Sequence, residues 1–134
     1  MEPTHAMPTI TQSPDRTQMA SVPTFITKDG SAIRELLHPA SSSVVHQSLA
    51  EAIVEPGQTT ELHLHRVSEE LYHITHGEGL MTLGDRAFLV RPGDSVVIKP
   101  GTPHCIQNLG DVQLKFLCCS APAYSHEDTD LLSP

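Results

Sequence analysis

The sequence predicts an all-β protein whose short strands close into a small barrel. Runs rich in Val, Ile, Leu and Thr alternate with turn sequences that contain proline and glycine, such as Arg91-Pro92-Gly93-Asp94 and Lys99-Pro100-Gly101. This rhythm of short strands and turns is typical of a barrel or a sandwich. Only 4% of the residues are aromatic and tryptophan is absent, so the core must be built from aliphatic side chains on many strands.

Three regions are expected along this chain of 134 residues, which has room for one domain. Residues 1–21 are rich in Thr, Ser, Pro and Gln and lack hydrophobic periodicity, so they are expected to form a disordered N-terminal arm. Residues 22–120 are expected to form the barrel. Residues 121–134 are expected to form a C-terminal tail without a strand, either solvated or laid against the barrel.

Within the barrel region, a short strand at 25–27 is expected to precede a single helical turn over residues 33–37, capped by Ser31 and ended by Pro39. Further strands follow, and Leu83-Gly84-Asp85-Arg86 joins two of them as a hairpin turn. Their expected ranges are 44–54, 60–65, 70–75, 79–83, 87–90, 95–98, 104–108 and 113–119.

The first histidine motif runs from Gly57 to Gly77. It places His63 and His65 two positions apart on one strand and Glu70 at the start of the next. Side chains at i and i+2 of a strand point to the same face, so both imidazoles can reach one ion. Glu70 can then add a carboxylate oxygen from another strand. Gly77 ends that strand in His76-Gly77-Glu78-Gly79, where the turn is expected to require a positive φ.

The second motif runs from Gly93 to Asn108. The strand at 95–98 lies between two proline and glycine turns, and His104 opens a new strand after the second turn. If His104 faces the barrel lumen, Ile106 and Asn108 face it as well, because side chains alternate along a strand.

Together the two motifs resemble those of the cupin superfamily, over about residues 48–120. The resemblance implies a double-stranded β-helix, or jelly-roll, barrel that holds one divalent metal on His63, His65, Glu70 and His104. Lys99 departs from the pattern, since the second motif usually has proline there, but it lies in a turn and does not remove a ligand. The short spacer between the motifs resembles that of small single-domain microbial cupins, and the resemblance favours a homodimer.

Three nitrogen ligands and one carboxylate suit Fe, Mn, Ni, Co, Cu or Zn, and the ligand set does not choose among them. An ion that accepts six ligands keeps two positions for a substrate with adjacent oxygens, or for substrate and O₂. Glu70 is also a candidate catalytic base. Tyr72 shares the lumen-facing parity of Glu70 and is a candidate catalytic or substrate-binding hydroxyl; the alternative is a core tyrosine bonded to the backbone.

Two classes of function therefore remain open, and the sequence does not decide between an enzyme and a binding protein. As an enzyme, the chain is expected to be a dioxygenase-type oxidoreductase, with an isomerase or lyase acting on a small polar or sugar-like substrate as the alternative. Oxygenation ranks above the isomerase because a phosphorylated sugar substrate would require a cluster of Lys and Arg, and the sequence has no basic stripe. The non-enzymatic alternative is a small-ligand or metal-binding cupin. The substrate itself is not determined, because loop and lumen geometry set specificity.

Charge and cysteine content exclude other classes. The net charge is −8 with no basic stripe, which argues against nucleic-acid binding. No apolar run is long enough for a membrane helix and no secretory signal is visible, so a cytoplasmic location is expected. The cysteines, Cys105, Cys118 and Cys119, are expected to be free thiols. Cys118 shares parity with Leu114 and Phe116 and is a candidate to line the barrel interior.

Overall fold

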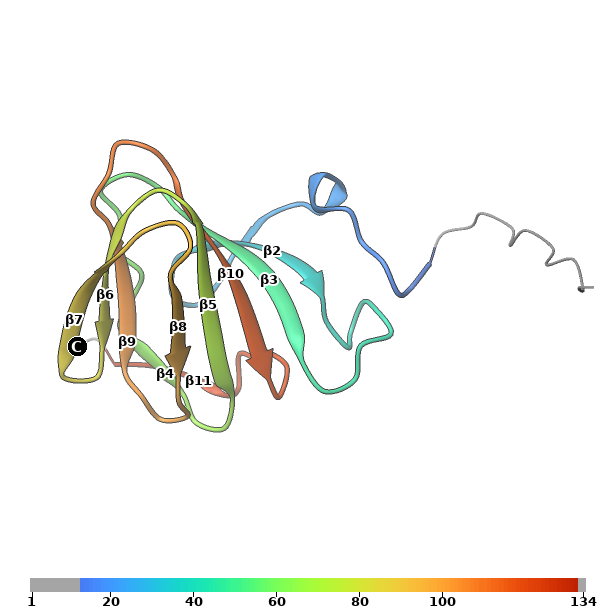
Figure 1. Cartoon of the computed structure of the whole chain (residues 1–134). Helices are drawn as coiled ribbons and strands as arrows, with labels where there is room; N and C mark the ends of the chain where they lie inside the picture. The colour runs from blue at the N-terminus through green and yellow to red at the C-terminus, as the bar shows by residue number, and fades with distance from the viewer. Residues whose placement is uncertain (1–12, 133–134) are drawn as a thin grey trace, which may run out of the picture.

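The computed structural model describes residues 13–132 and consists of two antiparallel sheets that face each other across a narrow interior (Figure 1). The six-stranded sheet has the order β1-β2-β3-β10-β5-β8, and the five-stranded sheet has the order β11-β4-β9-β6-β7. The strand bounds are β1 Phe25–Ile26, β2 Ala32–Leu37, β3 Ser48–Val54, β4 His63–His65, β5 Glu69–His76, β6 Gly79–Leu83, β7 Arg86–Val90, β8 Ser95–Ile98, β9 His104–Asn108, β10 Leu114–Ala121 and β11 Thr129–Leu131.

Alternating burial along the strands explains why the sheets face each other. In β5 the side chains of Glu70, Tyr72 and Ile74 are buried while their neighbours are exposed, and β10 buries every second residue from Leu114 to Ser120. A strand that is apolar on one side only must pack that side against another layer. The predicted lumen-facing positions are therefore confirmed, including Ile106 and Asn108 on β9.

The interior divides into an apolar part and a polar part. The apolar part is packed with fully buried aliphatic and aromatic side chains, including Ile74, Met81, Ile106 and Phe116. At its edge, Gly77 has φ +79°, and a Cβ there would lie 2.6 Å from the Gln113 carbonyl oxygen, so the expected glycine turn is confirmed. The polar part holds His63, His65, His104 and Glu70.

Two expectations about secondary structure are wrong. Residues 32–37 form strand β2 rather than a helical turn, because β2 pairs with β3 along most of its length and this pairing outweighs the local capping signal at Ser31. The C-terminal tail contains a strand: β11 pairs with the histidine strand β4, with Thr129 opposite His65 and Leu131 opposite His63. The tail is thus part of the five-stranded sheet.

The expected N-terminal arm, residues 1–21, falls partly outside the described residues, which begin at residue 13. Residues Met19–Ser21 form a short 3-10 helix, and the Thr17 hydroxyl donates a hydrogen bond of 2.9 Å to the Leu36 carbonyl. Residues 13–21 therefore touch the barrel. Whether the barrel needs them remains a prediction. Between residues 13 and 132, the structure has no helix long and apolar enough to span a membrane.

Candidate metal centre

Four side chains from three strands meet in the polar part of the interior. β4 supplies His63 and His65, β5 supplies Glu70 and β9 supplies His104. Each residue offers one ligand atom, and the four atoms lie within 4.8 Å of one another. All four residues are 5% exposed or less. The two sequence motifs thus form one cluster, which could hold a metal ion as predicted.

Hydrogen bonds to the backbone fix the tautomers of two of these histidines. The Nδ1 atom of His63 lies 2.7 Å from the Glu61 carbonyl oxygen, and the Nδ1 atom of His104 lies 2.9 Å from the Thr102 carbonyl oxygen. A carbonyl oxygen only accepts hydrogen bonds, so Nδ1 must carry the proton in both rings. In the neutral form, each Nε2 then presents a lone pair to the centre of the cluster, as a metal ligand must.

The third histidine is fixed by the C-terminal segment. The Nδ1 atom of His65 lies 3.0 Å from the Thr129 hydroxyl, and that hydroxyl donates its own hydrogen to the Ser125 carbonyl at 2.8 Å. Because its hydrogen is committed to Ser125, the hydroxyl accepts from His65, and Nδ1 again carries the proton. Sequence reasoning missed Thr129, because no strand was expected in the tail.

Glu70 completes the cluster from the opposite sheet. Its Oε1 atom lies 2.9 Å from Nε2 of His65 and 3.3 Å from Nε2 of His104, and the Ser120 hydroxyl donates to its other oxygen, Oε2, at 3.3 Å. Oε1 of Glu70 and Nε2 of His104 are fully buried and have no hydrogen-bond partner among the described residues. Buried polar atoms are normally satisfied, so these two converging lone pairs fit a cation between them.

The protonation equilibria indicate the same need for positive charge. Burial opposes ionisation of Glu70, yet the close approach of His104 and His65, which attract the carboxylate when their rings are protonated, outweighs burial and lowers the carboxyl pKa to about 2. Burial also lowers the pKa of His65, but its contact with the Glu70 carboxylate raises that pKa overall. The pKa of His63 is lowered, chiefly by burial and then by His104. Protons and a metal ion therefore compete for this cluster.

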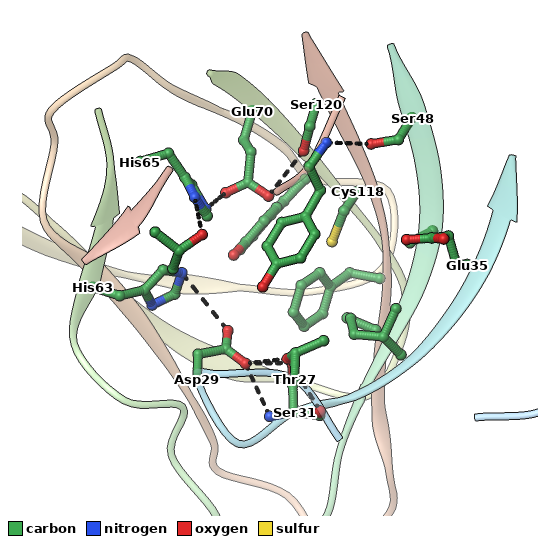
Figure 2. Close-up of a pocket in the computed structure, with 17 residues that line it drawn as sticks. Thr27, Asp29, Ser31, Glu35, Ser48, His63, His65, Glu70, Cys118 and Ser120 are labelled. Atoms are coloured by element: carbon green, nitrogen blue, oxygen red, sulfur yellow. Dashed lines mark hydrogen bonds and ion pairs between the residues drawn. The ribbon is translucent and has the colours of Figure 1, made fainter. Parts of the chain in front are cut away.

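A second carboxylate faces the cluster from the loop after β1. Oδ2 of Asp29 lies 3.7 Å from Nε2 of His63, as Figure 2 shows. Its other oxygen, Oδ1, accepts hydrogen bonds from the Thr27 hydroxyl at 2.8 Å and from the Ser31 hydroxyl and backbone N–H at 2.6 and 3.0 Å. These three donors hold Asp29 in place. The sequence marks this segment only as a turn, so Asp29 was missed.

The cluster opens on one side into a cavity of about 50 Å³. One ordered water needs roughly 10–15 Å³ on this measure, so the space suits a few ligand atoms. Ile33, Ala52 and Phe116 form part of an apolar wall, while Asp29 and Glu35 supply charged side chains. The cluster is therefore accessible to a small molecule from this side and is enclosed by protein on the others.

Tyr72, Cys118 and Tyr124 also line this cavity. Burial raises the pKa of both Tyr72 and Cys118 well above their ordinary values, so the phenol and the thiol keep their protons. The parity prediction for Cys118 is confirmed. Tyr124, from the C-terminal segment, packs edge-on against His65 with ring centres 5.9 Å apart; burial raises its pKa to about 12. The position of Tyr124 could not be inferred from the sequence, because it depends on how the C-terminal segment packs against the barrel.

The other described histidines lie outside the cluster. His73 and His76 are exposed, with Nδ1 bonded to the Ser95 hydroxyl and the Gln113 carbonyl respectively. None of the described histidines outside the metal cluster lines the cavity, namely His38, His46, His73, His76 and His126.

The family described as "Cupin domain" matches residues 50–120, the stretch that contains all four clustered residues. The chain belongs to the cupin family. The double-stranded β-helix expected from the two motifs is confirmed by solved structures, among them a predicted oxalate decarboxylase of Thermotoga maritima. That structure superposes with a TM-score of 0.70 and 22% identity, over 78% of this chain and 96% of the other.

Two curated proteins show how this cupin relates to others. It is 55% identical to an uncharacterized protein of Methanocaldococcus jannaschii over 123 residues, which cover 92% of this chain and 98% of that protein. It is 30% identical to the oxalate-binding protein of Thermotoga maritima over 86 residues, which cover 62% of this chain and 71% of the relative. The first relative reproduces nearly the whole chain and is itself uncharacterized.

Proposed function

We propose that this cupin is a metal-dependent enzyme, and that it catalyses a dioxygenase-type oxidation of a small substrate with adjacent oxygen atoms. The observation that carries the proposal is the cluster of three histidines with fixed tautomers and one carboxylate, open on one side to a small cavity. His63, His65, Glu70 and His104 would hold one divalent ion of the Fe, Mn, Ni, Co, Cu or Zn group. When bound, such an ion supplies Lewis acidity and, as iron or copper, redox chemistry.

The protein's own residues would bind and orient the substrate. Tyr72 keeps its proton because burial raises its pKa, so its hydroxyl acts as a hydrogen-bond donor rather than as a base. Glu70 stays ionised, since its pKa is about 2. It is the candidate base by position, but so low a pKa makes it a weak proton acceptor, so its main role would be to hold the ion. The apolar wall around Phe116 limits access of bulk water to this part of the cavity.

An isomerase or lyase is the second candidate, and Asp29 is the observation that favours it. Its carboxylate faces His63 at 3.7 Å and is held by Thr27 and Ser31, which suits a group that accepts a proton from a bound hydroxyketone. The third candidate is a binding protein without turnover, and a relative described as oxalate-binding supports it. All three candidates use the same metal cluster.

Oxygen consumption by the iron-loaded protein tests these alternatives. The purified protein would first be analysed for metals, then loaded with Fe(II) and mixed with hydroxyketones, diketones and catechols. Substrate-dependent O₂ uptake is expected, and it should disappear in His104→Ala. Product formation without O₂ uptake would favour the isomerase or lyase, while saturable binding with no product would favour the binding protein.

We also propose that the protein forms a homodimer. Leu71 and Val97 leave about half of their surfaces exposed, at 49% and 48%, and they are paired residues on neighbouring strands β5 and β8. An exposed apolar patch of this kind on a sheet face is suited to a second subunit. Light scattering during size-exclusion chromatography is expected to give the mass of two chains; the mass of a single chain would refute the dimer.

A further inference from the structure

The cavity beside the metal cluster is lined by acidic side chains without a basic counterpart. Three carboxylates, Asp29, Glu35 and Glu70, face it, and no lysine or arginine is among the described residues that line it. The histidines of the cluster must be neutral to bind a metal ion. The three negative charges would therefore exceed the two positive charges of a divalent ion, and the loaded cavity would remain negative overall.

Glu35 is the carboxylate that the metal cluster does not explain. It lies on β2 opposite Ala50, which also lines the cavity, and it is half-buried. Figure 2 shows it on the side of the cavity away from His63 and His65. Within residues 13–132, its carboxylate has no hydrogen bond or ion pair. The adjacent Arg34 instead pairs with Glu51 at 3.2 Å.

A half-buried carboxylate is stabilised when a donor approaches it. The cavity is also small, at about 50 Å³, so a ligand that reaches the metal cluster would lie within the electrostatic field of both Asp29 and Glu35. In a partly desolvated site, repulsion between like charges is much stronger than in water. Charge should therefore decide which small oxygen ligands enter.

We propose that the cavity selects small ligands without negative charge, which chelate the metal through oxygen atoms and donate a hydrogen bond to Glu35, and that it excludes dicarboxylates such as oxalate. Hydroxyketones are the simplest members of the selected class. The inference rests on the proposed function, since it concerns the same metal cluster. It separates this chain from its relative of Thermotoga maritima, which is described as oxalate-binding.

The test measures binding to the Co(II)-loaded protein, whose visible absorption responds to a new ligand on the metal. Hydroxyacetone and oxalate would be titrated separately into wild type, into Glu35→Gln and into Glu78→Gln. Gln keeps the size and a hydrogen-bonding oxygen but removes the charge. Glu78 lies exposed in the turn before β6 and does not line the cavity, so it is the matched control for the loss of one surface charge.

Wild type is expected to bind hydroxyacetone at least about tenfold more tightly than oxalate, and Glu35→Gln is expected to strengthen oxalate binding by about tenfold. Glu78→Gln should behave as wild type. Tighter binding of oxalate by wild type, or an unchanged preference in Glu35→Gln, would overturn the inference alone. Failure to bind Co(II) would overturn both the metal centre and the inference. Selective binding here, together with no O₂ uptake and no product in the iron-loaded protein, would support the inference and favour a binding protein over an enzyme.

Discussion

Replacement of Thr129 by valine should weaken metal binding although Thr129 is not a ligand. The hydroxyl accepts from Nδ1 of His65 at 3.0 Å and donates to the Ser125 carbonyl at 2.8 Å, and the residue is only 2% exposed. Valine has nearly the same shape but offers neither hydrogen bond. The Nδ1–H of His65 would then lose its partner in a buried environment, and the ring would lose the contact that selects its tautomer.

The size of the effect follows from these contacts. A buried group left without its hydrogen-bond partner costs about 1–3 kcal/mol. Loss of a contact that orients a metal-ligating histidine weakens metal affinity by about 10–100-fold. We therefore expect the dissociation constant for Zn(II) to rise by that factor in Thr129→Val. The metal-free variant should also unfold at a lower denaturant concentration, because the Ser125 carbonyl loses its donor as well.

Competition with a chromophoric chelator would measure the Zn(II) dissociation constant, and circular dichroism would confirm the β fold of each variant. Thr129→Ser keeps the hydroxyl and is the matched control, with affinity expected within a few-fold of wild type. Equal affinities for wild type and Thr129→Val, in a folded protein, would refute the role assigned to the C-terminal strand. Equal losses in the Ser and Val variants would show that packing of the methyl group matters instead.

Four further predictions concern the ligands, pH and the N-terminal segment. His65→Ala should release most of the metal yet stay folded, and stoichiometric metal in that variant would mean that the ligands are wrongly assigned. Metal affinity should fall below about pH 6.5 because protons compete for the imidazoles, so a chelator should lower the melting temperature more at about pH 7.5 than at about pH 5; equal shifts would contradict this. In metal-free protein, the pKa of Glu70 is lowered to about 2 from an ordinary 4.5, which contributes stability that is present above pH 4.5 and is lost as the pH falls towards 2. The pKa of His65 is raised from an ordinary 6.5, which contributes stability that is present below pH 6.5 and is lost as the pH rises through the raised value. The melting temperature of the metal-free protein, measured by thermal melts across this range, should therefore be highest between pH 4.5 and pH 6.5. Removal of the residues before Val22 should leave a soluble, folded barrel; insoluble protein would place the segment in the core or the dimer.

The shared orientation of His63 and His65 could be predicted from the sequence because it is local, whereas their convergence with Glu70 and His104 was implied by the resemblance to cupins. His63 and His65 share a face by strand alternation, and the turns before β4 and β9 are marked by proline and glycine. The same alternation correctly predicted which side chains of β5, β9 and β10 face the interior. These inferences need no knowledge of how distant segments pair.

Features that depend on distant pairing could not be predicted in the same way. The strand at 129–131 is only three residues long and sits in an acidic, proline-containing segment; it exists because β4 offers an edge to pair with. Strand β2 was missed because the capping signal at Ser31 is local, whereas its pairing with β3 is not. Asp29 reaches the cluster only through the path of the loop after β1.

A hydrogen bond joins the loop after β1 to the C-terminal strand β11. Lys28 donates a hydrogen bond to the Thr129 carbonyl across 101 positions in the sequence, and Thr129 in turn holds His65. Closing so long a loop is slow compared with forming a hairpin. The chain through Thr129 must therefore emerge from the ribosome and fold back before His65 is fully oriented, so tight metal capture should follow synthesis of this segment rather than accompany the earlier strands.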